Sequence, residues 1–205
     1  WVKARELREQ WQAQERPVWI AASTHEGEDE IVLAAHRQLL GHYPNALLML
    51  VPRHPERFNG VFELCQREGF VTVRRSQHTP VSAQTQVLLG DTMGELLVLY
   101  AVADSAFVGG SLVPNGGHNV LEPAALGKPV LSGPHLFNFL EIAALLREAG
   151  AWEEVDDAPG LAVAVQRLFE LPQDAQRMAE AGLKVMQANQ GALQRLLDGL
   201  ARLLH

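Results

Sequence analysis

The sequence predicts a Rossmann-like α/β fold, in which helices cover both faces of a doubly wound parallel sheet. Short, nearly continuous apolar runs recur along the 205 residues, as they do in strands that are buried on both faces. Amphipathic segments alternate with these runs, and glycine, proline and polar residues separate the two. Because right-handed crossovers keep such strands parallel, their carboxyl ends should meet at one edge of the sheet, where ligands bind.

The expected elements follow in order along the chain. Strands are predicted at residues 18–23, 46–51, 70–73, 86–89, 105–108 and 129–132, with a possible edge strand at 152–155. Helices are predicted at residues 3–15, from 31 to 40, up to 68, at 96–103, from 120 to 126, up to 150, at 161–171 and at 174–190. Leucines between residues 193 and 204 form one apolar stripe, typical of a helix that faces a core. Residues 76–85 are polar and are expected to form an exposed loop.

Length and composition favour one ordinary globular domain over residues 1–205. The formal net charge of −7 argues against a surface that coats nucleic acid, because such surfaces depend on clustered Lys and Arg. Cys65 is the single cysteine and forms no internal disulfide. No run is as long and apolar as a membrane span, and no signal peptide opens the chain. The chain starts at Trp1, so we expect a fragment of a longer protein.

The glycine-rich stretch from Gly109 to Gly117 is the strongest candidate for a binding site. It lies between a predicted strand and a predicted helix, where backbone N–H groups and the helix dipole favour a phosphate. Asn119 lies near the start of that helix, and Glu122 follows three residues later as an acceptor for the hydroxyls of a ribose. The alternative is a plain turn followed by a helix cap. The stretch is neither a dinucleotide fingerprint nor a P-loop.

Other loops are expected at the same edge. Arg53 and His54 follow a strand, and the guanidinium there would pair with a phosphate or base carbonyl, or with nearby surface carboxylates. Thr92 and Glu95 have the spacing of a capping box, and the backbone at residues 93–94 could present amides to a pyrimidine. The acidic run at residues 28–30 is interpreted as a solvated helix start, and no metal site is predicted.

Several of these segments, taken in order, resemble one family. They are Ala22–Glu28 (ASTHEGE), Val51–Phe58 (VPRHPERF), Gly90–Leu96 (GDTMGEL), Phe107–Leu112 (FVGGSL), Gly116–Ala124 (GGHNVLEPA) and Gly133–His135 (GPH). Together they are similar to the C-terminal half of the 3-deoxy-D-manno-octulosonic acid (Kdo) transferases, over about residues 19 to 150. The order of several motifs makes the resemblance specific.

The resemblance implies the donor-binding half of a GT-B glycosyltransferase of lipopolysaccharide biosynthesis. Such enzymes transfer Kdo from CMP-Kdo to the lipid A precursor (lipid IVA), with inversion and without a required metal or other cofactor. They work at the cytoplasmic face of the Gram-negative inner membrane. The catalytic base, a carboxylate, and the membrane anchor would lie in an N-terminal acceptor domain absent from this fragment. The fragment itself should be soluble, bind CMP and be inactive, and its final helices would cross back onto the absent half.

The resemblance also assigns roles to single residues. Arg53 should contact the cytidine portion, Met93 and Gly94 should line the base pocket, and Asn119 should reach the phosphate. Glu122 should bind the ribose hydroxyls. The full set of nucleotide-binding candidates is Arg53, His54, Thr92, Met93, Gly94, Gly110, Ser111, Asn119 and Glu122, with Thr24 and His25 as further candidates. Two alternatives stay open: a protein like the UDP-sugar epimerases, and a non-catalytic nucleotide-binding or protein-interaction module.

Overall fold

The computed structural model describes residues 1–203, without the side chains at positions 192, 193, 196, 197, 200, 201 and 203. Its centre is a seven-stranded parallel sheet with the strand order β3-β4-β2-β1-β5-β6-β7. The strands are β1 (Val18–Thr24), β2 (Leu47–Pro52), β3 (Thr72–Arg74), β4 (Val87–Leu89), β5 (Ser105–Val108), β6 (Val130–Ser132) and β7 (Trp152–Glu154). The predicted doubly wound sheet, including its edge strand, is confirmed.

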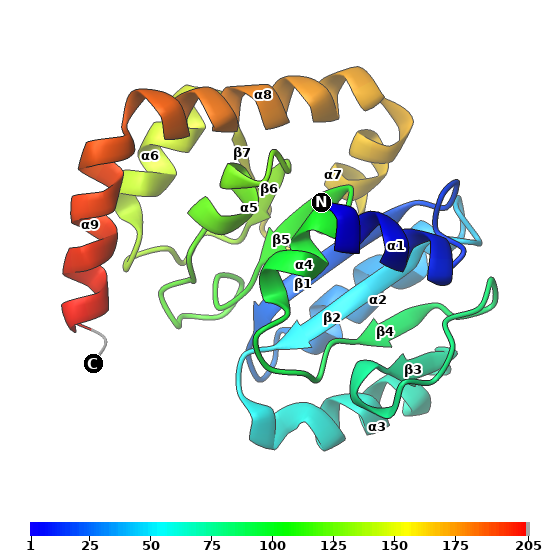
Figure 1. Cartoon of the computed structure of the whole chain (residues 1–205). Coiled ribbons are helices and arrows are strands. Elements are labelled where there is room, and N and C mark those ends of the chain that lie inside the picture. Colours follow the sequence, from blue (N-terminus) through cyan, green and yellow to red (C-terminus); the bar gives the residue numbers. More distant parts are fainter. Residues whose placement is uncertain (204–205) are drawn as a thin grey trace.

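Helices cover both faces of the sheet (Figure 1). One face carries α2 (Asp29–Leu40), α3 (Phe58–Arg67) and α7 (Ala158–Glu170), and the other carries α1 (Val2–Gln10), α4 (Leu96–Val102), α5 (Leu121–Ala125) and α6 (Leu140–Glu148). Two short 3₁₀ turns, η1 (Pro55–Arg57) and η2 (Arg75–Gln77), precede α3 and follow β3. The chain ends with α8 (Pro172–Ala188), which runs across one end of the molecule, and α9 (Gln190–Leu203).

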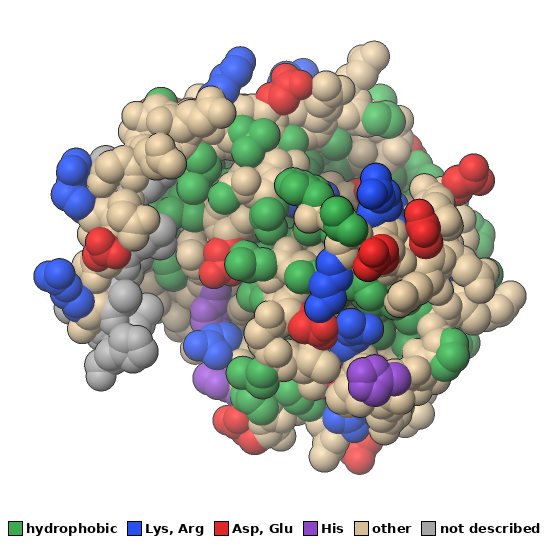
Figure 2. Space-filling model, in the orientation of Figure 1, with side chains coloured by type: hydrophobic (Ala, Val, Ile, Leu, Met, Phe, Trp, Pro, Cys, Tyr) green, Lys and Arg blue, Asp and Glu red, His purple; other side chains and the backbone are tan. Residues whose placement is uncertain are grey.

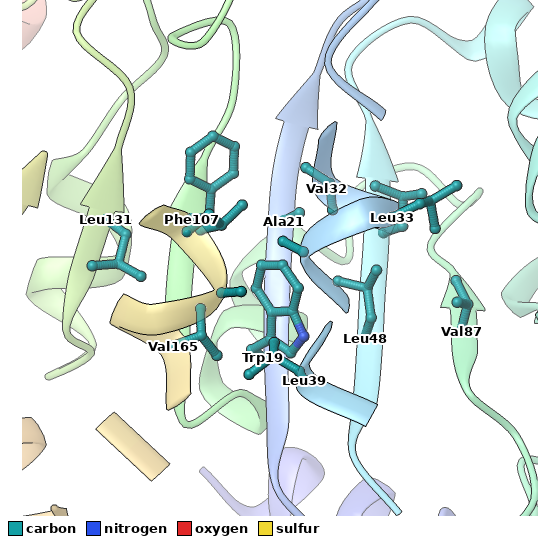
Figure 3. Packing of buried hydrophobic residues seen from close by; sticks show 14 of the residues in the cluster. Trp19, Ala21, Val32, Leu33, Leu39, Leu48, Val87, Phe107, Leu131 and Val165 are labelled. Carbon is teal, nitrogen blue, oxygen red and sulfur yellow. The ribbon is translucent and has the colours of Figure 1, made fainter. Parts of the chain in front are cut away.

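Alternate residues of the strands supply the core. Trp19, Ala21 and Leu48 point to the side of α2 and α7, where Figure 3 shows them packed among side chains of both helices. Ile20 and Met49 point the opposite way, toward α1 and α4. Because both faces are covered, β1 and β2 are buried at every position, which explains why these strands lack polar alternation in the sequence.

The order of the strands reverses beside β1. The chain moves from β1 to β2 on one side, and β5 later enters on the other side of β1. In open parallel sheets, the loops that leave the two strands at such a reversal diverge and leave a crevice for a ligand. The loops that follow β1 and β5 carry residues 25–28 and 109–120, which include the glycine-rich stretch.

Several boundaries differ from the predicted ones for local reasons. Helix α1 ends at Gln10 rather than at residue 15, because the chain turns through Gln12 with a positive φ of 52°. The loop at 76–85 is not simply exposed, since Val81 and Thr85 are buried. The Arg16 guanidinium donates to the carbonyl oxygens of Ser82 and Thr85 and fixes this loop against the sheet.

The predicted leucine stripe at residues 193–204 lies outside the described side chains, so its packing stays a prediction. The backbone places residues 190–203 in α9. Among residues 1–203, no helix is both long and apolar enough to span a membrane.

Candidate functional site

A cleft of about 330 Å³ opens where β2, β4 and β5 end. It is lined by six of the predicted nucleotide-binding residues, which come from three separate loops and α5: Arg53, Thr92, Met93, Gly94, Asn119 and Glu122. Apolar side chains, among them Val51, Phe58 and Leu99, form much of its wall. Figure 2 shows acidic, histidine and arginine or lysine side chains gathered along a furrow on one face of the molecule.

Arg53 is available for a ligand. Its backbone N–H donates to the Thr24 carbonyl (2.9 Å), which fixes the position of the residue directly after β2. Within residues 1–203 no carboxylate lies at ion-pair distance from its guanidinium, whereas the nearby Arg57 pairs with Asp29. Of the two alternatives for Arg53, pairing with nearby surface carboxylates therefore does not occur.

The loop after β4 presents the backbone of Gly94 and the flexible side chain of Met93 to the cleft. Met93 is 73% exposed, and Gly94 adopts a positive φ of 78°, a conformation that glycine tolerates and other residues rarely adopt. The expected capping box does not form, because the Thr92 hydroxyl donates to the Glu95 carboxylate instead of accepting from a backbone N–H, and no side chain caps α4. Arg75 binds both carboxylate oxygens of Glu95 (2.9 and 3.0 Å), and this ion pair, with Thr92, holds the pKa of Glu95 at about 2.

Asn119 and Glu122 form the opposite wall of the cleft. The Asn119 Oδ1 accepts a hydrogen bond from the Leu121 N–H (2.9 Å), which leaves its NH₂ group as the part that a ligand meets. Among the described side chains none donates to the Glu122 carboxylate, and burial raises its pKa. An amide donor and a carboxylate acceptor therefore face the cleft without partners of their own.

The glycine-rich loop does not present its amides to this cleft. The backbone N–H groups of Gly110, Ser111 and Leu112 donate to Glu28 (2.7, 3.1 and 2.9 Å), and the His25 N–H is a fourth donor at 3.2 Å. Burial raises the pKa of Glu28 and these four hydrogen bonds oppose the rise. The expectation that Gly110 and Ser111 frame a phosphate is therefore corrected: a carboxylate of the protein occupies those donors.

Glu28 also corrects the interpretation of the acidic run as a solvated helix start. Glu28 and Asp29 are 0% and 1% exposed. Asp29 accepts a hydrogen bond from the Thr24 hydroxyl (2.6 Å) and pairs with Arg57. The position of Glu28 is the signal that could have identified it. Glu28 lies in the short loop after β1, and β1 pairs with β5, the strand that precedes the glycine-rich loop.

Two other candidates have structural roles. Ser111 is fully buried, where its hydroxyl donates to the Val108 carbonyl (2.6 Å) and accepts from the Gly133 N–H (2.8 Å). Thr24 is also fully buried, and its hydroxyl donates a hydrogen bond to the Asp29 carboxylate. Neither side chain lines the cleft.

Three histidines meet beside the cleft. The Nε2 atoms of His25 and His118 are 2.6 Å apart, and the ring of His54 meets that of His25 edge-on at 5.2 Å between centroids. Burial and the neighbouring positive groups lower the pKa of His118 to about 4 and lower that of His25. His118 lines the cleft, but His25 and His54 lie outside it. The site residues predicted from the sequence do not include His118.

Ser23 is a second cleft residue that is not among the predicted site residues, although it lies in the Ala22–Glu28 segment of the family resemblance. It lies at the end of β1 with a positive φ of 59°, where the pairing register with β2 shifts. A residue other than glycine in this conformation stores backbone strain, and such strain is concentrated at functional sites. Within residues 1–203, no three His, Cys, Asp or Glu side chains are grouped so as to hold a metal ion.

Comparisons with known proteins identify relatives of the chain. The chain is 54% identical over 193 residues to the 3-deoxy-D-manno-octulosonic acid transferase of Haemophilus influenzae, which covers 94% of this chain and 45% of the relative. It is 43% identical over 190 residues to the transferase of the same name from Bordetella pertussis, covering 90% of this chain and 44% of that relative. No protein-family model matches the chain.

A solved structure is similar over nearly its whole length. It is the crystal structure of the C-terminal CMP-Kdo binding domain of WaaA from Acinetobacter baumannii, with a TM-score of 0.87, 38% identity, and coverage of 91% of this chain and 97% of that domain. The chain belongs to the Kdo transferase family. This Kdo transferase chain spans less than half the length of the curated relatives that it matches.

The fold is that of one Rossmann-like half of a GT-B glycosyltransferase. A more distant structure, Anabaena Alr3699/HepE in complex with UDP-glucose, shares the fold at 17% identity, with a TM-score of 0.68 over 99% of this chain and 52% of that one. Membership of the Kdo transferase family decides against the epimerase-like alternative.

Proposed function

We propose that the cleft binds the CMP portion of CMP-Kdo and that the chain is the donor-binding domain of a Kdo transferase. The full-length enzyme would transfer Kdo to the lipid A precursor at the cytoplasmic face of the bacterial inner membrane, with inversion and without a metal or other cofactor. The catalytic base and the membrane anchor would belong to the part of the relatives that this chain does not cover.

One observation carries this proposal: six of the predicted nucleotide-binding residues line a single cleft. Their chemistry matches the parts of a cytidine nucleotide. Gly94 and Met93 offer backbone groups and an adaptable apolar side chain to a base, and Glu122 offers an unpartnered acceptor to two ribose hydroxyls. Arg53 and the Asn119 NH₂ are donors for the phosphate between them.

The same donors would assist the reaction. When the sugar leaves, the CMP phosphate gains negative charge. Hydrogen-bond donors already directed at that phosphate therefore stabilise the transition state more than they stabilise bound CMP-Kdo. The Leu121 N–H fixes the Asn119 side chain, so its NH₂ group needs no reorientation as the charge develops, and the Thr24 carbonyl fixes the backbone from which the Arg53 side chain extends. Glu122 contributes binding and not charge stabilisation.

The test is a titration of Glu122→Ala with CMP by calorimetry. Hydrogen bonds to a charged group are worth about 1.5–3 kcal/mol, so we expect the affinity for CMP to fall about 10- to 100-fold. Wild-type protein should also bind 2′-deoxy-CMP more weakly than CMP, because one ribose hydroxyl is missing. The variant should bind both nucleotides equally, since the partner of that hydroxyl is gone.

The control is Glu148→Ala, which removes an exposed carboxylate at the end of α6. It should leave the affinity for both nucleotides unchanged. A folded Glu122→Ala variant that still distinguishes CMP from 2′-deoxy-CMP would remove Glu122 from the ribose site. Competition with UDP measures base selection at residues 92–94.

Activity is tested with the two halves of the enzyme. The isolated chain should transfer no sugar, and mixing it with the remaining half of a full-length relative should restore transfer. Turnover by the chain alone would show that the base lies within its residues. Failure of the mixture, with both halves folded, would favour a non-catalytic nucleotide-binding module.

A further inference from the structure

The three histidines beside the cleft have no role in the binding of CMP described above. His25 follows β1, His54 follows β2, and His118 lies in the loop between β5 and α5. Their rings form a continuous group, with centroids 4.9 Å apart for His25 and His118 and 5.2 Å apart for His25 and His54. His118 belongs to the wall of the cleft, so the group begins where the nucleotide site ends.

The fold holds these rings in place. Glu28 ties the loop that carries His25 to the loop that carries His118, through its hydrogen bonds with His25 N–H and with the amides of residues 110–112. The Arg53 N–H ties the loop of His54 to Thr24. Gly110 lies against the group with a positive φ of 69°, and a Cβ there would be 3.0 Å from the His118 ring. The group is thus a built feature and not a chance meeting of surface side chains.

The contact between His25 and His118 limits how many protons the pair holds. At 2.6 Å between the two Nε2 atoms, one nitrogen must donate and the other must accept. The two rings therefore cannot both be positively charged imidazolium ions in this arrangement. A single additional proton would turn the pair into a cation, with the second ring as an acceptor.

The charges around the group favour an arriving anion. Arg53 and Arg57 act on His25, and Arg53 also acts on His118. The acidic groups nearby are already engaged: Glu28 by four backbone N–H groups, and Asp29 by Thr24 and Arg57. Glu122 is the remaining carboxylate that lines the same cleft as His118. Burial, together with these positive neighbours, lowers the pKa of His118 to about 4, so His118 stays neutral until a negative charge enters.

We propose that His25, His54 and His118 form a second anion subsite, which receives the carboxylate of the donor's sugar and takes up a proton as it does so. The inference rests on the proposed function, because Kdo is a sugar acid joined to the CMP phosphate. Such a donor carries two anionic groups, and the cleft offers Arg53 as the unpaired cation for one of them. The pair of His25 and His118 supplies the second positive charge only when the carboxylate arrives, which distinguishes a sugar acid from a neutral sugar.

The test compares CMP with CMP-Kdo by calorimetry at pH 7.5, in buffers of different ionisation enthalpy. We expect no proton uptake with CMP and uptake approaching one proton with CMP-Kdo. Linkage then requires the affinity for CMP-Kdo to fall as the pH rises, by up to about tenfold per pH unit for one proton, while that for CMP stays flat. Histidine ring signals in NMR spectra of the wild-type protein should report the same proton.

Two variants locate the proton. His25→Gln should abolish the uptake and lower the affinity for CMP-Kdo at least tenfold, and His54→Gln, at an exposed position, should reduce both without affecting folding. His42→Gln, an exposed residue after α2, is the matched control and should change neither.

Each other outcome has a distinct meaning. Equal proton uptake with CMP would mean that the phosphate occupies the histidines, which overturns the assignment to a carboxylate. CMP-Kdo binding without uptake, or with uptake unchanged in His25→Gln, would overturn the inference while the nucleotide site stands. A wild-type protein that binds neither ligand would refute the proposed function itself.

Discussion

Replacing Glu28 by Gln should destabilise the fold strongly, although the side chain keeps its shape and volume. Glu28 is completely buried, and each of its two carboxylate oxygens accepts two backbone N–H groups. In Gln one oxygen becomes an NH₂ group, which donates and does not accept. Two backbone donors then lose their acceptor and face another donor, and the remaining two bond a neutral oxygen instead of a charged one.

The magnitude follows from these four hydrogen bonds. An unsatisfied buried donor costs about 1–3 kcal/mol, and a hydrogen bond to a neutral acceptor is about 1 kcal/mol weaker than one to a charged acceptor. Gln also avoids the burial of a charge, which offsets part of the loss. We therefore expect a net loss of about 3 kcal/mol in the free energy of unfolding, or about 6–12 °C in Tm for a domain of this size.

Urea denaturation of the isolated chain measures this loss. Glu26→Gln is the control, because Glu26 is exposed in the same loop and should change the free energy of unfolding by less than about 0.5 kcal/mol. Equal stability of Glu28→Gln and the control would refute the reasoning, since it would mean that the four amides do not depend on a charged acceptor.

Four further predictions concern the rest of the domain. His36 is fully buried with its pKa lowered to about 3, so the unfolded chain binds a proton near pH 6.5 and the folded chain does not. Stability should fall by about 1.4 kcal/mol per unit as the pH drops from 6.5 toward 3, and His36→Gln should show a shallower slope in the same denaturation assay. Gly109→Ala should destabilise by about 1–3 kcal/mol, because a Cβ there would be 2.6 Å from the Ser23 carbonyl oxygen. Gly60→Ala in α3, where a Cβ meets nothing within 4 Å, should stabilise by about 0.5–1 kcal/mol by the same measurement. Cys65 is buried with its pKa raised to about 12, so maleimide should label it only when urea unfolds the chain, and rapid labelling in native buffer would contradict its burial.

The fold could be predicted from the sequence because its strands are buried on both faces. Runs such as those of β1 and β2 contain almost no polar residue, and this pattern occurs in few architectures other than a covered parallel sheet. The ends of elements were harder to place. Helix α1 stops at a left-handed Gln12, and glutamine gives no signal for that conformation.

The candidate site was predicted in part, for a physical reason. Loops that leave parallel strands at the same edge must converge, so Arg53, Asn119 and Glu122 could be grouped from topology alone. The sequence could not show whether a ligand or a side chain of the protein would accept the hydrogen bonds of the loop amides. A glycine-rich loop has the same sequence whether its amides face a ligand or a buried carboxylate, and only the structure places Glu28 among them.

The carboxylate of Glu28 has a consequence for the thermodynamics of ligand capture. Phosphate-gripping loops of other folds are completed by the anion that they bind, whereas here the anion is part of the chain and the loop is assembled before any nucleotide arrives. Association should then require little ordering of backbone, so its heat-capacity change should reflect the desolvated apolar wall of the cleft and not a coupled folding event.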